Sequence, residues 1–482
     1  MRNEARSTRS QVVIVGGGIA GAWLAYRLAQ RAVRTVLISD DDQKPPLSLG
    51  AAGLINQDTI NSTDRTAPAV FSDISTTQDP RYRARMIERA RDEFDALSRL
   101  VEYAPIGEFV YPLGPTPGIR LGAGGDVVGR VLAEFTELGG TRLRGRVTDL
   151  VMEGDTCLGV RYEHDGQPGK VLAGDVVLAS GGFTGLFADG LGSDNGHLLG
   201  TFARRGGSLA NLELFNWVAL GDPERRCPLY PPDLEGARLL RSGEPATELM
   251  QALAAFAGDS IDLDVYTRYW IDNLDVPHTA ELVSGTGRLG PVRGFSMGGM
   301  APASESGTGP ANVHATGEAE YGMSLDSLTG KPFLSFIVRG AELAETLAKR
   351  ASDEPTADFD AGPAAPSADT ALQPEIRRRL AAVQDNRFTT EGAHDFAQWC
   401  ARERARHLAD ASTDTESVDV LIVAESYIRA VLARRESRGF FYRPDFRVPD
   451  PELDNQVTRC RYDAEANEVH VSLSPAGATA VV

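Results

Sequence analysis

The chain has 482 residues, of which 42% are hydrophobic and 24% are charged, and its formal net charge is −18. A surface this acidic repels nucleic acid and anionic lipid, which excludes both as partners, and the length suits two or three domains. We expect a cytoplasmic protein with a short frayed N-terminal tail, because the charged first ten residues resemble no signal peptide and no apolar run reaches the roughly 20 residues that span a bilayer.

The first predicted element is a dinucleotide-binding turn between a strand and a helix. Residues 11–15 form a continuous apolar run typical of a buried parallel strand, and a helix is predicted from Ile19 to about Ala32. Between them, Gly16, Gly18 and Gly21 complete the pattern G-x-G-x-x-G. The three glycines allow a tight turn, close approach of a pyrophosphate and close packing of the helix on the strand.

A second predicted strand supports this interpretation. Residues 35–39 are apolar and β-branched, and they end at Ser39 and Asp40. A residue that contacts the ribose is expected about 20 residues after the glycine turn, which is where these two lie. The pyrophosphate is then expected at the helix N-terminus, beside Ile19 and Ala20.

Two later segments favour FAD over NAD. The apolar run 176–178 ends in the small residues Ala179, Ser180 and Gly181, which let a cofactor approach the backbone. The segment 308–321 contains a short strand that ends at Gly317 and Glu318. In flavoproteins with two dinucleotide folds, such a segment brings an acidic residue to the FAD ribose. The FAD domain is therefore expected to be discontinuous.

The remaining elements are read from hydrophobic periodicity. The pattern predicts amphipathic helices over 80–103 and at the end of 122–140, a hairpin over 144–163, a helix within 239–259, a helical bundle over 375–435 and a strand pair over 460–473. The four cysteines and seven histidines form no ligand cluster, so no metal site is predicted.

Several segments, in order along the chain, resemble the flavoprotein subunits of succinate dehydrogenase and fumarate reductase, and most closely L-aspartate oxidase. They are Ser48–Asn56, Gly192–Trp217, Gly294–Met300 and Ala424–Phe446. The resemblance implies an α/β fold: a discontinuous, Rossmann-like FAD domain, an inserted α+β capping domain and a C-terminal helical domain with terminal strands. The expected boundaries are 1–224 and 294–352 for the FAD domain, 225–293 for the capping domain, 353–369 for a linker and 370–482 for the C-terminal domain.

Motif and resemblance together give a set of expected FAD contacts. These are Gly16, Gly18, Ile19, Ala20, Gly21, Ser39, Asp40, Ser48, Ala51, Ala52, Gly53, Val147, Ala179, Ser180, Gly181, Asp194, Gly317, Glu318, Phe333 and Leu334. The family's flavin-attaching histidine has no counterpart near Leu47 and Ser48, so FAD is expected to be bound non-covalently.

The departures from the family argue against a dicarboxylate substrate. Val218 stands where a substrate histidine is expected, Gly294, Phe295 and Ser296 replace His-Tyr-Thr, and Lys331 is the one cation near an expected arginine. Each lost charge-assisted hydrogen bond costs about 1.5–3 kcal/mol of binding. The candidate catalytic residues are then Arg293, Ser296, Tyr321 and Lys331, with Arg293 favoured because it adjoins the turn expected at Gly294, Phe295 and Ser296.

The predicted function is that of an FAD-dependent dehydrogenase, oxidase or desaturase. It would act on a small amino-acid or carboxylate derivative in a biosynthetic pathway, with hydride transfer to flavin N5 and with oxygen or another electron acceptor. A homo- or hetero-oligomer is compatible with this. The alternatives are a catalytically degenerate flavin-binding subunit in assembly or regulation, a reductase or monooxygenase fed by NAD(P)H, and L-aspartate oxidase proper.

Overall fold

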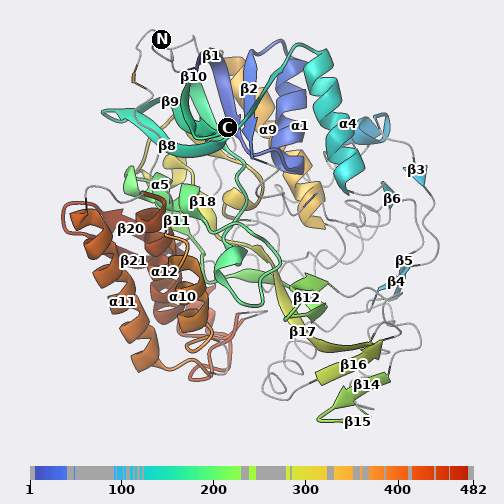
Figure 1. The fold of residues 1–482 in the computed structure, drawn as a ribbon, viewed down its shortest axis with the longest axis vertical. Helices are drawn as coiled ribbons and strands as arrows, with labels where there is room; N and C mark the ends of the chain where they lie inside the picture. Colours follow the sequence, from blue (N-terminus) through green and yellow to red (C-terminus); the bar gives the residue numbers. More distant parts are fainter. Residues whose placement is uncertain are drawn as a thin grey trace.

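The computed structural model has an α/β sheet at one end, a helical bundle beside it and a smaller antiparallel sheet that extends away from both (Figure 1). The structure describes residues 6–40, 48, 89, 92–93, 95–100, 103–104, 109–111, 114–116, 120–121, 124–228, 238–245, 278–282, 285–322, 331–350, 359–360, 369–384, 387–410, 415–438, 441–454 and 456–475.

The main sheet is built on β1 (Arg6–Val15), which pairs in parallel with β2 (Thr35–Ser39) and β10 (Gln167–Leu178). Parallel pairing continues to β7 (Thr141–Arg144) beyond β2 and to β19 (Val313–Ala315) beside β10. Because parallel strands end at the same edge, the segments that follow β1, β2, β10 and β19 meet there. The expected hairpin of β8 (Arg146–Glu153) and β9 (Thr156–His164) completes the sheet in antiparallel pairing.

The two faces of this sheet pack against different layers. Val12, Ile14 and Leu37 are buried against α1 (Ile19–Ala29), α4 (Gly124–Glu137) and α9 (Lys331–Arg350). The alternate residues of the same strands, such as Val13 and Ile38, face the other core, which includes α5 (His197–Arg204) and the C-terminal bundle. Burial on both faces explains why these strands are continuously apolar.

The C-terminal region forms the expected bundle and strand pair. The helices are α10 (Leu372–Leu380), α11 (Thr390–Ala409) and α12 (Thr415–Ala433). The side chain of Thr389 caps α11 by accepting a hydrogen bond from Gly392 N–H at 3.0 Å. The strands β20 (Gln456–Asp463) and β21 (Glu468–Pro475) join β11 (Ser208–Ala210) and β18 (Gly299–Ala301) in a second sheet.

A third sheet is antiparallel and extends away from the bundle in Figure 1. It contains β12 (Phe215–Asp222), β13 (Cys227–Pro228), β14 (Arg238–Arg241), β15 (Glu244–Pro245), β16 (His278–Leu282) and β17 (Gly285–Ser296). Smaller elements are β3 (Tyr103–Ala104) with β6 (Arg120–Leu121), β4 (Phe109–Tyr111) with β5 (Gly114–Thr116), the helix α8 (Ala303–Ser306) and short 3-10 turns at Thr184–Leu186, Gly317–Ala319 and Pro451–Leu453.

Three local predictions need correction. Residues 6–10 are not a frayed tail, because they pair with residues 169–173 of β10. The helix expected over 239–259 begins instead as the β14–β15 hairpin, whose turn at Ser242 and Gly243 takes positive φ angles of 53° and 88°. The segment 294–296 is not a turn but the end of β17.

Other expectations fall largely outside the described residues. They are the helix over 80–103, the linker 353–369 and the rest of 239–259, and the domain boundaries stay a prediction. Within the described part of the chain, no helix is both long and apolar enough to cross a membrane.

Candidate functional site

A cavity opens at the edge where the parallel strands end, and its empty volume is about 1050 Å³ including the open mouth. The expected cofactor residues that line it are Gly16, Gly18, Ile19, Ala20, Ser39, Asp40, Ser48, Val147, Ala179, Ser180, Gly181, Asp194, Gly317 and Glu318. The structure therefore brings together residues from seven separate stretches of the chain.

The glycine turn after β1 has the geometry that a dinucleotide requires. Gly16 has a φ of +119°, and a Cβ atom there would lie 2.1 Å from the carbonyl oxygen of Ala179. Gly21 does not line the cavity; a Cβ atom at this position would lie 2.1 Å from the carbonyl oxygen of Gly16. Gly16 thus makes the turn, and Gly21 lets the helix pack against it.

Two further observations show that the cavity fits a phosphate-bearing cofactor. The first turn of α1 carries no acidic side chain, so its positive dipole end faces the cavity uncompensated. Ser48 helps to hold this helix end, since its Oγ accepts a hydrogen bond from Ile19 N–H at 3.1 Å. The Oγ1 of Thr316 is buried in the lining and has no hydrogen-bond partner among the described residues, which leaves a polar group for a ligand to satisfy.

Glu318 is an acid of the cavity lining. Its pKa is raised to about 8, chiefly by burial and also by the nearby charge of Asp194. Hydrogen bonds to its Oε1 from the N–H and Oγ of Ser296, at 2.8 and 3.1 Å, oppose this shift. Ser296, a candidate catalytic residue, does not itself line the cavity and acts on it through Glu318.

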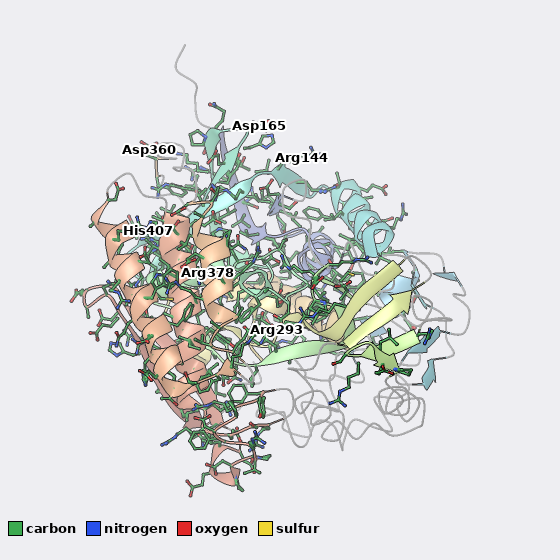
Figure 2. The ribbon with its side chains drawn as sticks, turned by 60° about the horizontal axis from the view of Figure 1, so that its bottom comes forward. Arg144, Asp165, Arg293, Asp360, Arg378 and His407 are labelled. Carbon is green, nitrogen blue, oxygen red and sulfur yellow. The ribbon has the colours of Figure 1, made fainter. Side chains whose placement is uncertain are left out.

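Arg293, the favoured candidate for a substrate cation, is buried elsewhere. Its side chain is 2% exposed, forms an ion pair with Asp189 and lies 4.6 Å over the ring of Phe187. Figure 2 shows it between the C-terminal helices and the β12–β17 sheet. The backbone pairs with the same loop, since Leu191 N–H donates to the Arg293 carbonyl at 2.8 Å.

A bulge explains why Arg293 points away from the cavity while Phe295 lines it. Residues two apart on a regular strand share a face. The pairing of β17 with β12 shifts register here, with Phe295 opposite Asn216 and Arg293 opposite Trp217. Gly294 is therefore an extra residue, and a bulge of this kind reverses the alternation of side chains.

The other predicted site residues either lie away from the cavity or fall outside the described residues. Tyr321 packs with Ala210, Ala301 and Val457 in the core of the second sheet. Lys331, Phe333 and Leu334 belong to the first turn of α9, and their side chains lie outside the described residues, as do Ala51, Ala52 and Gly53 altogether.

Several lining residues have no role in the sequence prediction. They are Val15, Gly17, Ile38, Gly145, Arg146, Asn195, Gly196, His197, Leu198, Phe295, Thr316 and Phe336. Gly17 and Thr316 lie inside the recognised motifs and could have been found. Arg146, Asn195 and His197 have no signal in spacing or periodicity, because tertiary packing alone brings them to the cavity.

Comparisons with known proteins agree with this geometry. Residues 11–113 match the family model described as FAD dependent oxidoreductase. No curated protein matches the chain by sequence. Among solved structures, FrdA of E. coli quinol fumarate reductase superposes with a TM-score of 0.75 at 15% identity, covering 99% of this chain and 98% of that one.

Two more structures share the fold. The Sdh1 complex of Mycobacterium smegmatis gives a TM-score of 0.71 at 17% identity, covering 98% of this chain and 94% of that chain. Adenylylsulfate reductase from Archaeoglobus fulgidus gives 0.65 at 15% identity, covering 98% and 97%. The expected fold, the resemblance to the fumarate reductase and succinate dehydrogenase flavoproteins and the expected cofactor FAD are thereby confirmed. The closer likeness to L-aspartate oxidase stays a prediction.

Proposed function

We propose that the chain is an oxidoreductase that binds FAD non-covalently and moves a hydride between the flavin and a small organic substrate. One observation carries this proposal: the glycine turn after β1, the end of β10 and the segment 316–318 line a single cavity. These are three of the places where the sequence predicts contact with FAD. The family match over residues 11–113 supports the same reaction class.

The roles of the lining residues follow from their positions. The amides of the turn at Gly16 and Gly18 and the N-terminus of α1 would hold the pyrophosphate, and Ser39 and Asp40 would bind the ribose. When bound, FAD supplies the hydride acceptor at N5 of its ring. Glu318, with its pKa raised to about 8, holds a proton at neutral pH and can donate it within the cavity.

The substrate is proposed to be an amino-acid or carboxylate derivative with less negative charge than a dicarboxylate. Phe295 and Phe336 line the cavity as an edge-to-face pair, with ring centroids 6.3 Å apart. Phe336 lies near Gly317, the residue that precedes the acid Glu318. Aromatic walls beside the acid Glu318 favour an apolar or singly charged group over two carboxylates. A biosynthetic role, with oxygen or another small electron acceptor, would suit such a substrate.

The test is an anaerobic reduction of the FAD-loaded protein. A panel of amino acids, amines, monocarboxylates and dicarboxylates is added without NAD(P)H, and the flavin absorbance is followed. We expect bleaching by a compound with at most one carboxylate, and return of the absorbance when oxygen or an artificial acceptor is added.

Other outcomes would contradict the proposal in distinct ways. A protein that binds no FAD has no flavin chemistry. Bleaching by NAD(P)H alone identifies a reductase or monooxygenase, and bleaching by succinate or aspartate restores the dicarboxylate reading. A flavin that no donor reduces indicates a degenerate subunit.

A further inference from the structure

One carboxylate at the start of α12 joins two sides of the cofactor cavity. Glu416 is 8% exposed, and its Oε1 accepts a hydrogen bond from Asn195 Nδ2 at 2.9 Å. Its Oε2 forms an ion pair with the guanidinium of Arg146. Arg146 and Asn195 both line the cavity, but they come from the start of β8 and from the loop before α5. Glu416 therefore connects the two from behind, out of the C-terminal bundle.

The same two sides are also joined directly. Asn195 Oδ1 accepts a hydrogen bond from His197 N–H at 3.2 Å. The ring of His197 donates from Nε2 to the carbonyl oxygen of Val147 at 3.1 Å. We call residues 146–147 and 195–197 the adenosine wall, because they lie next to the expected ribose site. Gly145, which precedes this wall, donates its N–H to the carbonyl of Ser39 at 3.0 Å.

The position of Glu416 is fixed by the helix that carries it. One turn later on α12, Asp419 is fully buried and accepts hydrogen bonds from Thr201 Oγ1 and Arg204 Nε, both at 2.7 Å. A Cβ atom at Gly200 would lie 2.1 Å from the Asp419 carbonyl oxygen, so α5 and α12 touch at backbone distance. The packing of α12 against α5 therefore keeps the backbone at Glu416 within side-chain reach of Arg146 and Asn195.

We infer that Glu416 is a positioning residue for the adenosine half of the cofactor, supplied to the FAD domain by the C-terminal bundle. Its carboxylate holds Asn195 and Arg146 at the spacing that the adenosine wall needs, and removing it would leave Arg146 without this partner. The inference rests on the proposed function only in that the ligand carries an ADP group.

The test measures dissociation constants of ADP and of FAD for the full chain, since ADP occupies only the adenosine half. Glu416→Ala removes both contacts, and we expect both dissociation constants to rise roughly 10- to 100-fold, the usual effect of losing a buried charged hydrogen bond. Glu416→Gln retains an acceptor for Asn195 and should recover part of the loss. At saturating FAD, the absorbance spectrum of the bound flavin should match the wild type, because the flavin end is untouched.

The matched control is Glu425→Gln. Glu425 is another buried carboxylate of α12, but it pairs with Arg404 of α11 and with Arg429. Glu425→Gln should lower the melting temperature of the protein and leave the dissociation constant of ADP within about twofold of the wild-type value.

Three results would overturn the inference. Glu416→Ala could leave ADP binding within about twofold of the wild type, or Glu425→Gln could weaken it equally, which would make the effect one of general stability. A wild-type protein that binds neither ADP nor FAD would remove the proposed function as well, whereas the first two results would leave it standing.

Discussion

At Gly16, a single backbone position decides whether the cavity can form. Its φ of +119° is disfavoured for any residue with a side chain, and Ala179 closes the space that a Cβ atom would need. The neighbouring Gly181 is similar, since a Cβ atom there would lie 2.2 Å from Asp194 Oδ2. The shape of the lining thus depends on the glycines, which have no Cβ atom, as well as on the side chains that are present.

We expect Gly16→Ala to abolish FAD binding and to destabilise the protein by several kcal/mol, because the strained φ and the overlap with Ala179 add together. Thermal unfolding and FAD titration measure both effects. Gly129→Ala is the control: Gly129 lies in α4, and a Cβ atom there meets nothing within 4 Å. This change should stabilise the helix by about 0.5–1 kcal/mol, and equal losses in the two variants would contradict the argument.

Glu318 gives the cofactor-free protein a defined pH dependence. Its pKa is raised from 4.5 to about 8, so the folded chain keeps a proton that the unfolded chain has already lost. The resulting stabilisation is complete below about pH 4.5 and disappears as the pH rises towards 8. One pKa unit corresponds to about 1.4 kcal/mol, which makes the full change a few kcal/mol.

In the variant Glu318→Gln the side chain is neutral at every pH, so the pH-dependent contribution of Glu318 to stability is absent. We therefore expect the wild type to lose unfolding free energy relative to Glu318→Gln between about pH 5 and 8, measured by urea denaturation at a series of pH values. Parallel curves for the two proteins would show that Glu318 is ionised throughout the folded state.

At the scale of elements, α12 joins the bundle to the rest of the molecule. On one side it contacts α5 through Asp419, and on the other it contacts α11 through the fully buried pair of Glu425 and Arg404. Arg404 also donates to the side chain and backbone of Asn467, at 2.6 and 2.9 Å, in the turn between β20 and β21. One guanidinium thus ties both helices to the terminal strands.

We expect Arg404→Met to destabilise the protein by about 3–5 kcal/mol. In the described part of the chain, it leaves the buried Glu425 with only the partly exposed Arg429 as an ion-pair partner. Arg406 lies on the same helix, and its side chain is 63% exposed. Arg406→Met removes its pair with Glu403, which should cost less than about 1 kcal/mol. Urea unfolding compares the two, and similar midpoints would mean that burial of the pair is energetically unimportant.

At the scale of the whole molecule, the cofactor cavity and the bundle are parts of one connected structure. The ion pairs of Glu416 and Asp419 cross from α12 to β8 and α5. Anything that stabilises the cavity should therefore stabilise the bundle as well.

We expect calorimetry to show one unfolding transition that moves upward as FAD is added. FAD at 100 times its dissociation constant should add about 2.7 kcal/mol of stability. Two transitions, of which only one responds to FAD, would show that the bundle unfolds independently.

How much the sequence reveals depends on the range of the interactions involved. The glycine turn, the strand ends and the bundle have local patterns, and the structure has them where the patterns predict. The direction of Arg293 could not be predicted, because it depends on a bulge set by pairing with a distant strand. The contribution of Glu416 is hidden for the same reason, since it lies 221 residues from Asn195. Hydrogen bonds and ion pairs between residues that are far apart in the sequence produce no periodic pattern along the chain.

The extra residue Gly294 has a consequence for how the charge at the cavity can change. In β17 a one-residue slip along β12 would carry an arginine to the cavity side, with no amino acid replaced. The charge offered to a substrate would then change through an insertion or deletion in a neighbouring turn. Specificity in this architecture can therefore diverge by realignment of a strand, and comparison of side-chain identities alone would miss the event.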